Sequence, residues 1–298
     1  MATKIEWTEE TWNPITGCSP ISSGCDHCYA MRMARRLAGR AGYPKIHPFR
    51  PGTYHEDKIK APFHWRKPRM VFVGSMGDMF HPAVAFEHIL EVWTTMTRLI
   101  IPGPDVPPER RNDYNHTYQI LTKRPREILN FIEWNRDRYE RGSEDCIIPS
   151  KLFPPWIWIG VTAEHQGTAE DRIPVLLEIP AALRFVSVEP MIGPIDLEHV
   201  YLSPGFLVDV LRGGNWGSYY PGKFTNHSDM TTIDWVICGG ETGPGARWIN
   251  PHWVHQLARQ CREAGKPFFF KKWGDWMKRN GKIVPDQMPR EYPRRENQ

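Results

Sequence analysis

The chain has 298 residues, of which 40% are hydrophobic and 12% aromatic, so it is long enough and apolar enough to bury a substantial core. Its formal net charge of +4 permits a nucleic-acid partner without requiring one. No apolar run approaches the ~20 residues of a membrane span, and the N-terminus lacks the apolar stretch of a secretory signal, so we expect a cytoplasmic protein without membrane contact.

Short apolar runs typical of buried strands alternate with helical patterns along the chain. Strands are predicted at 12–16, 70–73, 118–121, 156–161, 183–188, 235–238 and 268–270. Helices are predicted at 28–37, 83–99, 126–134, 169–178 and 253–264. This alternation indicates βα units around a parallel sheet, and the length suits one α/β barrel domain covering residues 1–298.

Three inserted loops interrupt the alternation, at 101–116, 135–155 and 201–232. Loops of this length are usually functional or disordered. Glycine and aromatic residues gather in 211–222, which favours a lid or substrate loop, with disorder as the alternative. The tail after residue 281 is rich in proline and charge and is expected to be peripheral.

Glycine, hydroxyl or charged residues follow six of the predicted strands. In βα barrels the carboxyl ends of the strands carry the active site, so we expect these residues to share one rim. The alternative is that each of them only caps the next helix. The candidates in chain order are Gly74, Ser75, Gly77, Asp78, Lys123, Arg124, Thr162, Glu164, Glu189, Glu241 and Lys271.

Three cysteines, Cys18, Cys25 and Cys28, lie in one short segment after the first predicted strand. In a reducing compartment such a cluster indicates a metal or redox site rather than disulfides. Three thiolates leave a fourth corner of a metal site open, whereas structural zinc is normally closed by four protein ligands. Three interpretations are open at this point: a zinc site, a Cys25–Cys28 redox pair, and an iron–sulfur cluster with one open iron. The histidines that could complete a zinc site are His27, His47 and His55.

Six motifs are dispersed along the chain in a fixed order. They are WNPITGC at 12–18, GCDHCY at 24–29, SVEPMIGPI at 187–195, GGETGPGAR at 239–247, PHW at 251–253 and PFFFKKWG at 267–274. Over almost its whole length the chain resembles the radical S-adenosylmethionine (SAM) superfamily, and within it a phage-associated three-cysteine family. The superfamily commonly has Cys-x3-Cys-x2-Cys, whereas this chain has Cys-x6-Cys-x2-Cys.

The resemblance implies a partial (β/α) TIM-type barrel of six to seven parallel strands. It implies a [4Fe-4S] cluster on the three cysteines, whose open iron binds SAM. An electron from an external donor then cleaves SAM to a 5′-deoxyadenosyl radical. Some phage members of the family are linked to DNA hypermodification. The implied reaction is therefore isomerisation of an amino-acid-modified thymidine, in DNA or as a nucleotide, in the host cytoplasm.

The same resemblance distributes roles over the rim. The turn after the second strand would contact the SAM amino group, Lys123 or Arg124 its carboxylate, and the end of the fourth strand its ribose. The residues expected to bind the cofactors, beyond the cysteines, are His27, Tyr29, Gly74, Ser75, Gly77, Asp78, Lys123, Thr162 and Glu164. The residues expected to act on or anchor the substrate are Glu189, Glu241, Arg247 and Lys271.

A second hypothesis is a zinc-bearing nucleic-acid-binding protein without catalysis. The basic segment 32–40 would then contact the phosphate backbone, and the abundant aromatic residues would stack on bases.

Overall fold

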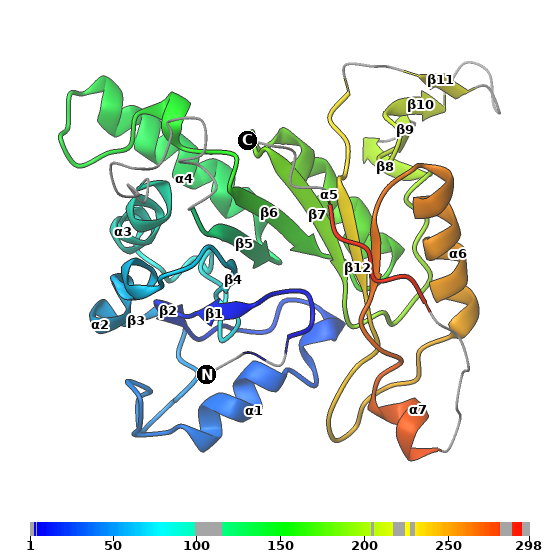
Figure 1. Ribbon diagram of the computed structural model, residues 1–298, viewed down its shortest axis with the longest axis horizontal. Coiled ribbons are helices and arrows are strands. Elements are labelled where there is room, and N and C mark those ends of the chain that lie inside the picture. The colour runs from blue at the N-terminus through cyan, green and yellow to red at the C-terminus, as the bar shows by residue number, and fades with distance from the viewer. Residues whose placement is uncertain are drawn as a thin grey trace.

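Seven parallel strands form the main sheet of the protein, in the order β1-β4-β5-β6-β7-β12-β13. The computed structural model describes residue 3 and residues 5–98, 115–203, 206–216, 224–226, 230–280 and 288–293. The sheet curls into a half-barrel, with helices between successive strands (Figure 1). This confirms the predicted α/β class and the partial barrel of six to seven strands. The strands are β1 (Glu10–Trp12), β4 (Met70–Val73), β5 (Thr117–Thr122), β6 (Ile157–Thr162), β7 (Leu183–Val188), β12 (Trp235–Cys238) and β13 (Phe268–Phe270).

The helices follow the local signals expected of them. In α6, Pro251 occupies the first turn and the Asn250 side chain accepts a hydrogen bond from the His252 N–H at 3.0 Å. The helices are α1 (Tyr29–Arg36), α2 (Glu56–Ile59), α3 (Phe86–Thr97), α4 (Pro125–Glu140), α5 (Gln166–Glu178), α6 (Pro251–Glu263) and α7 (Asp275–Arg279). Short 3-10 turns cover Ser23–Cys25, Ala61–His64 and Pro149–Lys151. None of the described helices is both long and apolar enough to cross a membrane.

The predicted strand at 12–16 is two strands. β1 ends at Trp12, and β2 (Ile15–Thr16) leaves the main sheet to pair with β3 (Thr53–Tyr54). Pro14 has no N–H to continue a ladder, and the Asn13 side chain turns away to accept from the Met76 N–H at 2.8 Å. The break directs the cysteine segment over the end of the half-barrel.

Two of the predicted loops contain regular structure. Residues 135–140 continue α4, because their charged side chains remain in solvent while the helix packs on its other face. The 201–232 segment contributes to a four-stranded antiparallel sheet whose first strand packs on α5 (Figure 1). Its strands are β8 (Val200–Ser203), β9 (Phe206–Asp209), β10 (Gly214–Trp216) and β11 (Phe224–Asn226). Within the predicted insertions, residues 101–114, 204–205, 217–223 and 227–229 lie outside the described residues, as do residues 282–287 and 294–298 of the tail.

Aromatic side chains fill the interior of the half-barrel below the carboxyl ends of the strands. Trp7, Trp158, Phe185 and Trp235 belong to one buried cluster, separate from the larger core between the sheet and its helices. Gly160 on β6 makes room for them, since a Cβ there would lie 2.4 Å from the Phe185 ring. Three of the chain's tryptophans therefore pack the interior below the rim and leave the strand ends available for a site.

Candidate functional site

The cysteine segment crosses the carboxyl ends of the strands and leads into α1. Cys18 follows β2, Cys25 ends a 3-10 turn, and Cys28 directly precedes α1. All three are free thiols and partly exposed, in contrast to Cys238 and Cys261, which are buried. We call residues 17–28 the cysteine loop.

Asp78, in the turn after β4, fastens the first part of this loop through a cation. Its carboxylate pairs with Arg124 at 3.2 Å, and that guanidinium contacts Cys18 Sγ at 3.3 Å and the Ser19 carbonyl at 2.9 Å. The Asp78 carboxylate also accepts hydrogen bonds from the Thr122 hydroxyl at 2.8 Å and from the backbone N–H groups of Phe80 at 3.1 Å and Lys123 at 3.2 Å. Both of its oxygens are therefore already used, and neither is free to accept from the SAM ammonium expected there.

Glu164, at the end of β6, fastens the middle of the loop. It is fully buried and accepts a hydrogen bond from the Ser22 hydroxyl at 2.5 Å. It also pairs with Lys123, whose ammonium lies 3.4 Å from Cys25 Sγ. The second oxygen pairs with Arg172 of α5 at 2.9 Å. The predicted ribose contact is thus occupied by the protein's own groups.

Glu241, after β12, fastens the last part of the loop. One oxygen accepts from His27 Nδ1 at 2.9 Å and the other pairs with the Arg247 guanidinium at 2.6 Å. Arg247 continues to the loop, donating to the Ser23 carbonyl at 2.9 Å and contacting the Asp26 carboxylate at 3.3 Å. Residues predicted to touch substrate instead connect a strand end to the cysteine loop.

Two glycines bring the loop against the turn after β4. Gly17 and Gly77 form an isolated parallel bridge, and the Gly17 N–H donates to the Met76 carbonyl at 3.0 Å. A Cβ on Gly77 would lie 2.7 Å from the backbone N and O of Gly17. Gly17 has φ +88°, and a Cβ there would lie 1.8 Å from the Arg50 carbonyl oxygen. No larger residue fits either position without moving backbone.

Ser75 and Tyr29 join the same turn to the start of α1. The Tyr29 hydroxyl donates to the Ser75 carbonyl, and the Ser75 hydroxyl lies 3.1 Å from the Asn13 amide. Burial of the hydroxyl raises the pKa of Tyr29, and the charges of Cys28 and Glu189 act in the same direction. Tyr29 therefore supports the turn at 74–77, which remains the predicted contact for SAM.

Glu189 and Lys271 form a separate pair across β7 and β13. Lys271 Nζ lies 2.7 Å from Glu189 Oε1, and the side chains are 13% and 19% exposed respectively. They pass over Gly239, where a Cβ would meet both at 3.4 Å. Among the described residues this is the only hydrogen bond of either charged group, so two N–H donors and one oxygen are left for a ligand.

The pKa values of Cys18 and Cys25, the two cysteines that lie beside cations, shift in opposite directions. Burial raises the pKa of Cys18 to about 11, with Asp78 adding to the effect and Arg124 opposing it. Burial also acts to raise the pKa of Cys25, but Lys123 and hydrogen bonds from the loop lower it overall. For Glu164, burial is outweighed by Lys123 and Arg172, which lower its pKa to about 2. The carboxylate is therefore ionised at any physiological pH.

The donor chemistry of the loop fits an iron–sulfur cluster. In the described part of the chain, no three His, Cys, Asp or Glu side chains converge as the ligands of a single ion. Cluster thiolates bind different irons, and therefore stand farther apart than the ligands of one ion. Three free, partly exposed thiols on one loop, two of them beside Lys123 and Arg124, supply such ligands together with cations that offset their negative charge.

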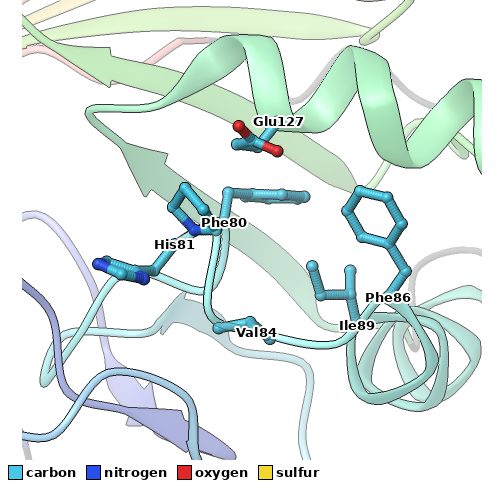
Figure 2. A pocket seen from close by; sticks show the side chains of 7 residues that line it. Phe80, His81, Val84, Phe86, Ile89 and Glu127 are labelled. Atoms are coloured by element: carbon cyan, nitrogen blue, oxygen red, sulfur yellow. The ribbon is translucent and has the colours of Figure 1, made fainter.

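Two cavities lie beside the loop. One, of about 240 Å³, lies between the segment after β4, α3 and α4 and is lined mostly by apolar side chains. Figure 2 shows Glu127 of α4 on one side of it and His81 on another, and His81 also lies 2.7 Å from the Ser19 hydroxyl. None of the predicted site residues lines this cavity. The other, of about 410 Å³, is lined by Cys18 and by residues of α1 and the 47–51 segment.

Several residues that hold the site together are absent from the candidates drawn from the sequence, among them Asn13, Ser22 and Arg172. Ser22 was identifiable only as part of the cysteine segment, and Arg172 lies within a helical pattern with nothing to distinguish it. Arg32, expected to be solvated or to contact nucleic acid, donates to the Thr242 carbonyl at 3.0 Å.

A model of one protein family, described as proteins of unknown function (DUF5131), matches residues 2–296. The chain belongs to the DUF5131 family. No curated protein and no solved structure matches the chain. Membership in DUF5131 therefore covers the half-barrel and the cysteine loop together and assigns no activity to either.

Proposed function

We propose that this protein is a radical SAM enzyme in which Cys18, Cys25 and Cys28 hold a [4Fe-4S] cluster. The observation that carries the proposal is the position of the cysteine loop, fastened to the carboxyl ends of β4, β6 and β12 with cations against two of its sulfurs. When bound, the cluster and SAM supply a 5′-deoxyadenosyl radical that abstracts hydrogen from a substrate. Barrel enzymes place their chemistry at this edge of the sheet.

Some of the protein's own residues position the cysteine loop, and others are left to contact SAM. Asp78, Glu164 and Glu241 fix the loop, and we assign them no contact with SAM or substrate. The turn at 74–77 and Thr162 remain as SAM contacts, since glycine backbone allows close approach and Thr162 lies at the end of β6. Lys123 offsets the charge of Cys25 and stays paired with Glu164.

For the substrate we propose a modified thymidine that carries an amino acid, which the enzyme isomerises. Among the described residues, Lys271 keeps N–H donors and Glu189 keeps an acceptor oxygen that are not used in their mutual pair. The donors suit the carboxylate of such a group, and the acceptor suits its ammonium. A base in duplex DNA would have to be flipped out to reach a barrel rim. Six free cysteines suit a reducing cytoplasm with an external electron donor, and we propose that compartment.

The cofactor proposal is tested by anaerobic reconstitution followed by assays of iron, sulfide and 5′-deoxyadenosine with dithionite as reductant. We expect about four iron atoms per chain and SAM cleavage in the native protein. Cys25→Ala should lose both, whereas Cys146→Ala, which removes a partly exposed thiol outside the cysteine loop, should keep both. Colourless protein containing zinc, or an iron protein that does not cleave SAM, would contradict the proposal.

The substrate proposal is tested by mass spectrometry of nucleosides from the source genome with and without the gene. Loss of one modified thymidine and accumulation of its isomer is the expected result. Lys271→Met should retain dithionite-dependent SAM cleavage while losing the isomer product. An unchanged nucleoside profile would leave the cofactor proposal intact and reject this substrate.

A further inference from the structure

The chain between His27 and His55 contains cations and no carboxylates. It carries Arg32, Arg35, Arg36, Arg40, Lys45 and Arg50, with no Asp or Glu among them. Arg32 is used internally, as its guanidinium donates to the Thr242 carbonyl at 3.0 Å. The other five are exposed, and in the part of the chain that the structure describes none of them forms an ion pair. We call these five residues the basic face.

The basic face borders the cavity that Cys18 lines. This cavity of about 410 Å³ lies between α1 and the 47–51 segment, and Arg35 and Arg50 line it along with apolar Met31 and Phe49. Apolar side chains are also exposed nearby, with Met33 41% and Ile46 75% exposed. Cations without ion pairs among the described residues, on the same segment as exposed apolar side chains, are the composition expected of a docking surface for an acidic protein.

Cys18 connects this face to the proposed cluster. Its sulfur lies 3.3 Å from Arg124 on the strand side, and the same residue borders the cavity on the α1 side. A protein seated on the basic face would therefore lie next to one of the cluster ligands. The proposed chemistry requires one electron for each SAM cleavage, which the resemblance assigns to an external donor.

We propose that the basic face docks an acidic, low-potential electron-donor protein that carries a flavin or an iron–sulfur centre. The inference rests on the proposed function. In the step, the donor loses one electron and the [4Fe-4S] cluster gains it, passing from the 2+ to the 1+ state, with no bond formed or broken. The exposed Met33 and Ile46 favour a folded protein partner over nucleic acid, because phosphate contacts need cations but no apolar centre.

The test compares two variants of equal charge change. Arg36→Glu/Arg40→Glu/Lys45→Glu reverses three cations of the basic face. Arg66→Glu/Lys67→Glu/Arg136→Glu reverses three exposed cations elsewhere on the chain. The probe is an acidic flavodoxin, whose binding to each protein is measured by calorimetry, and whose hydroquinone reduces each reconstituted protein in anaerobic stopped flow.

At low ionic strength we expect the first variant to lose at least about tenfold in both flavodoxin affinity and reduction rate, with dithionite reduction unchanged. The second variant should stay within about twofold of the native protein, and added salt should remove the difference between all three. Equal losses in both variants, or no loss in the first, would overturn the inference. Duplex DNA binding is measured for the same proteins. A loss in the first variant that is confined to DNA binding would also overturn the inference, because the face would then be a nucleic-acid contact. If no cluster forms, the proposed function fails by its iron and dithionite assays, while calorimetry with flavodoxin still decides whether the face docks this class of protein.

Discussion

At the scale of single residues, the three acidic side chains at the rim are engaged by the protein itself. Asp78, Glu164 and Glu241 each bind a cation that in turn contacts the cysteine loop. Glu164 is the most deeply buried of them and has two cationic partners. Removing one member of a buried charge network leaves the others desolvated and unpaired, which costs more than the network itself contributes.

We therefore expect Glu164→Gln to lower the free energy of unfolding by about 3 kcal/mol at pH 7. The pKa of Glu164 falls from its ordinary value of 4.5 to about 2 on folding, so its contribution is fully present above pH 4.5 and is lost as the pH falls towards 2. Urea unfolding over that pH range should show the native and variant curves converging. Glu133→Gln, at an exposed position of α4, is the control and should have little effect. A difference that persists unchanged at pH 2 would contradict the assigned charge network.

The composition of the rim was predictable from the sequence, but the partners of its residues were not. Polar residues directly after apolar strands identified Asp78, Lys123, Glu164 and Glu241, because parallel strands end at one edge. Whether such a carboxylate is open or occupied depends on groups far away in the chain, such as Ser22 for Glu164, 142 positions apart. No local pattern encodes that pairing, so the sequence could not show that these carboxylates are already engaged by the protein's own groups.

At the scale of elements, the cysteine loop and the turn after β4 meet backbone to backbone at Gly17 and Gly77. Gly17 and Gly77 allow this approach, and it places the first cysteine over the sheet edge. A methyl group on Gly77 would force one of the two segments to move, since the nearest atoms that it would meet are backbone atoms of Gly17 and Thr16.

Gly77→Ala should therefore lower the free energy of unfolding by about 1–3 kcal/mol and increase the rate at which Cys18 is alkylated in the apoprotein. Gly167→Ala is the matched control, because Gly167 lies in α5 and a Cβ there would meet only His165 at an ordinary 3.4 Å. Alanine is favoured over glycine in a helix, so the control should be neutral or slightly stabilising. Native-like alkylation in Gly77→Ala would show that the contact does not position the loop.

The long apolar strands were predicted almost residue for residue, because both faces of a parallel sheet are buried and such strands appear as continuous apolar runs. The strands at 70–73, 183–188, 235–238 and 268–270 match their predicted bounds. The short strands β8 to β11 escaped prediction, since strands of only three or four residues carry no distinguishable period. Pro14 marked the end of β1, but its effect was not recognised in the sequence.

At the scale of the whole molecule, the aromatic cluster inside the half-barrel supports the rim from below. Phe185 packs against Trp7 and Trp235, with ring centroids 6.3 and 5.8 Å away, and occupies the space left by Gly160. Because the strands that carry the rim also carry this cluster, we expect the loop and the interior to lose their structure together.

Phe185→Ala should lower the free energy of unfolding by about 3–5 kcal/mol. The midpoints of urea unfolding followed by tryptophan fluorescence and by alkylation of the loop cysteines should shift together. Phe63→Ala, which truncates a side chain 41% exposed, should shift neither midpoint appreciably. A shift seen by fluorescence alone would mean that the loop is ordered independently of the barrel interior.

Because residues far along the chain hold the cysteine loop, its contacts form in a fixed order as the chain is synthesised. Ser23 receives a hydrogen bond from Arg247, 224 positions later in the chain. At about 5–20 residues per second, roughly 10–45 s separate the emergence of the two residues from the ribosome. The contact that holds the last part of the cysteine loop can thus form only when most of the chain has been made, well after the cysteines themselves.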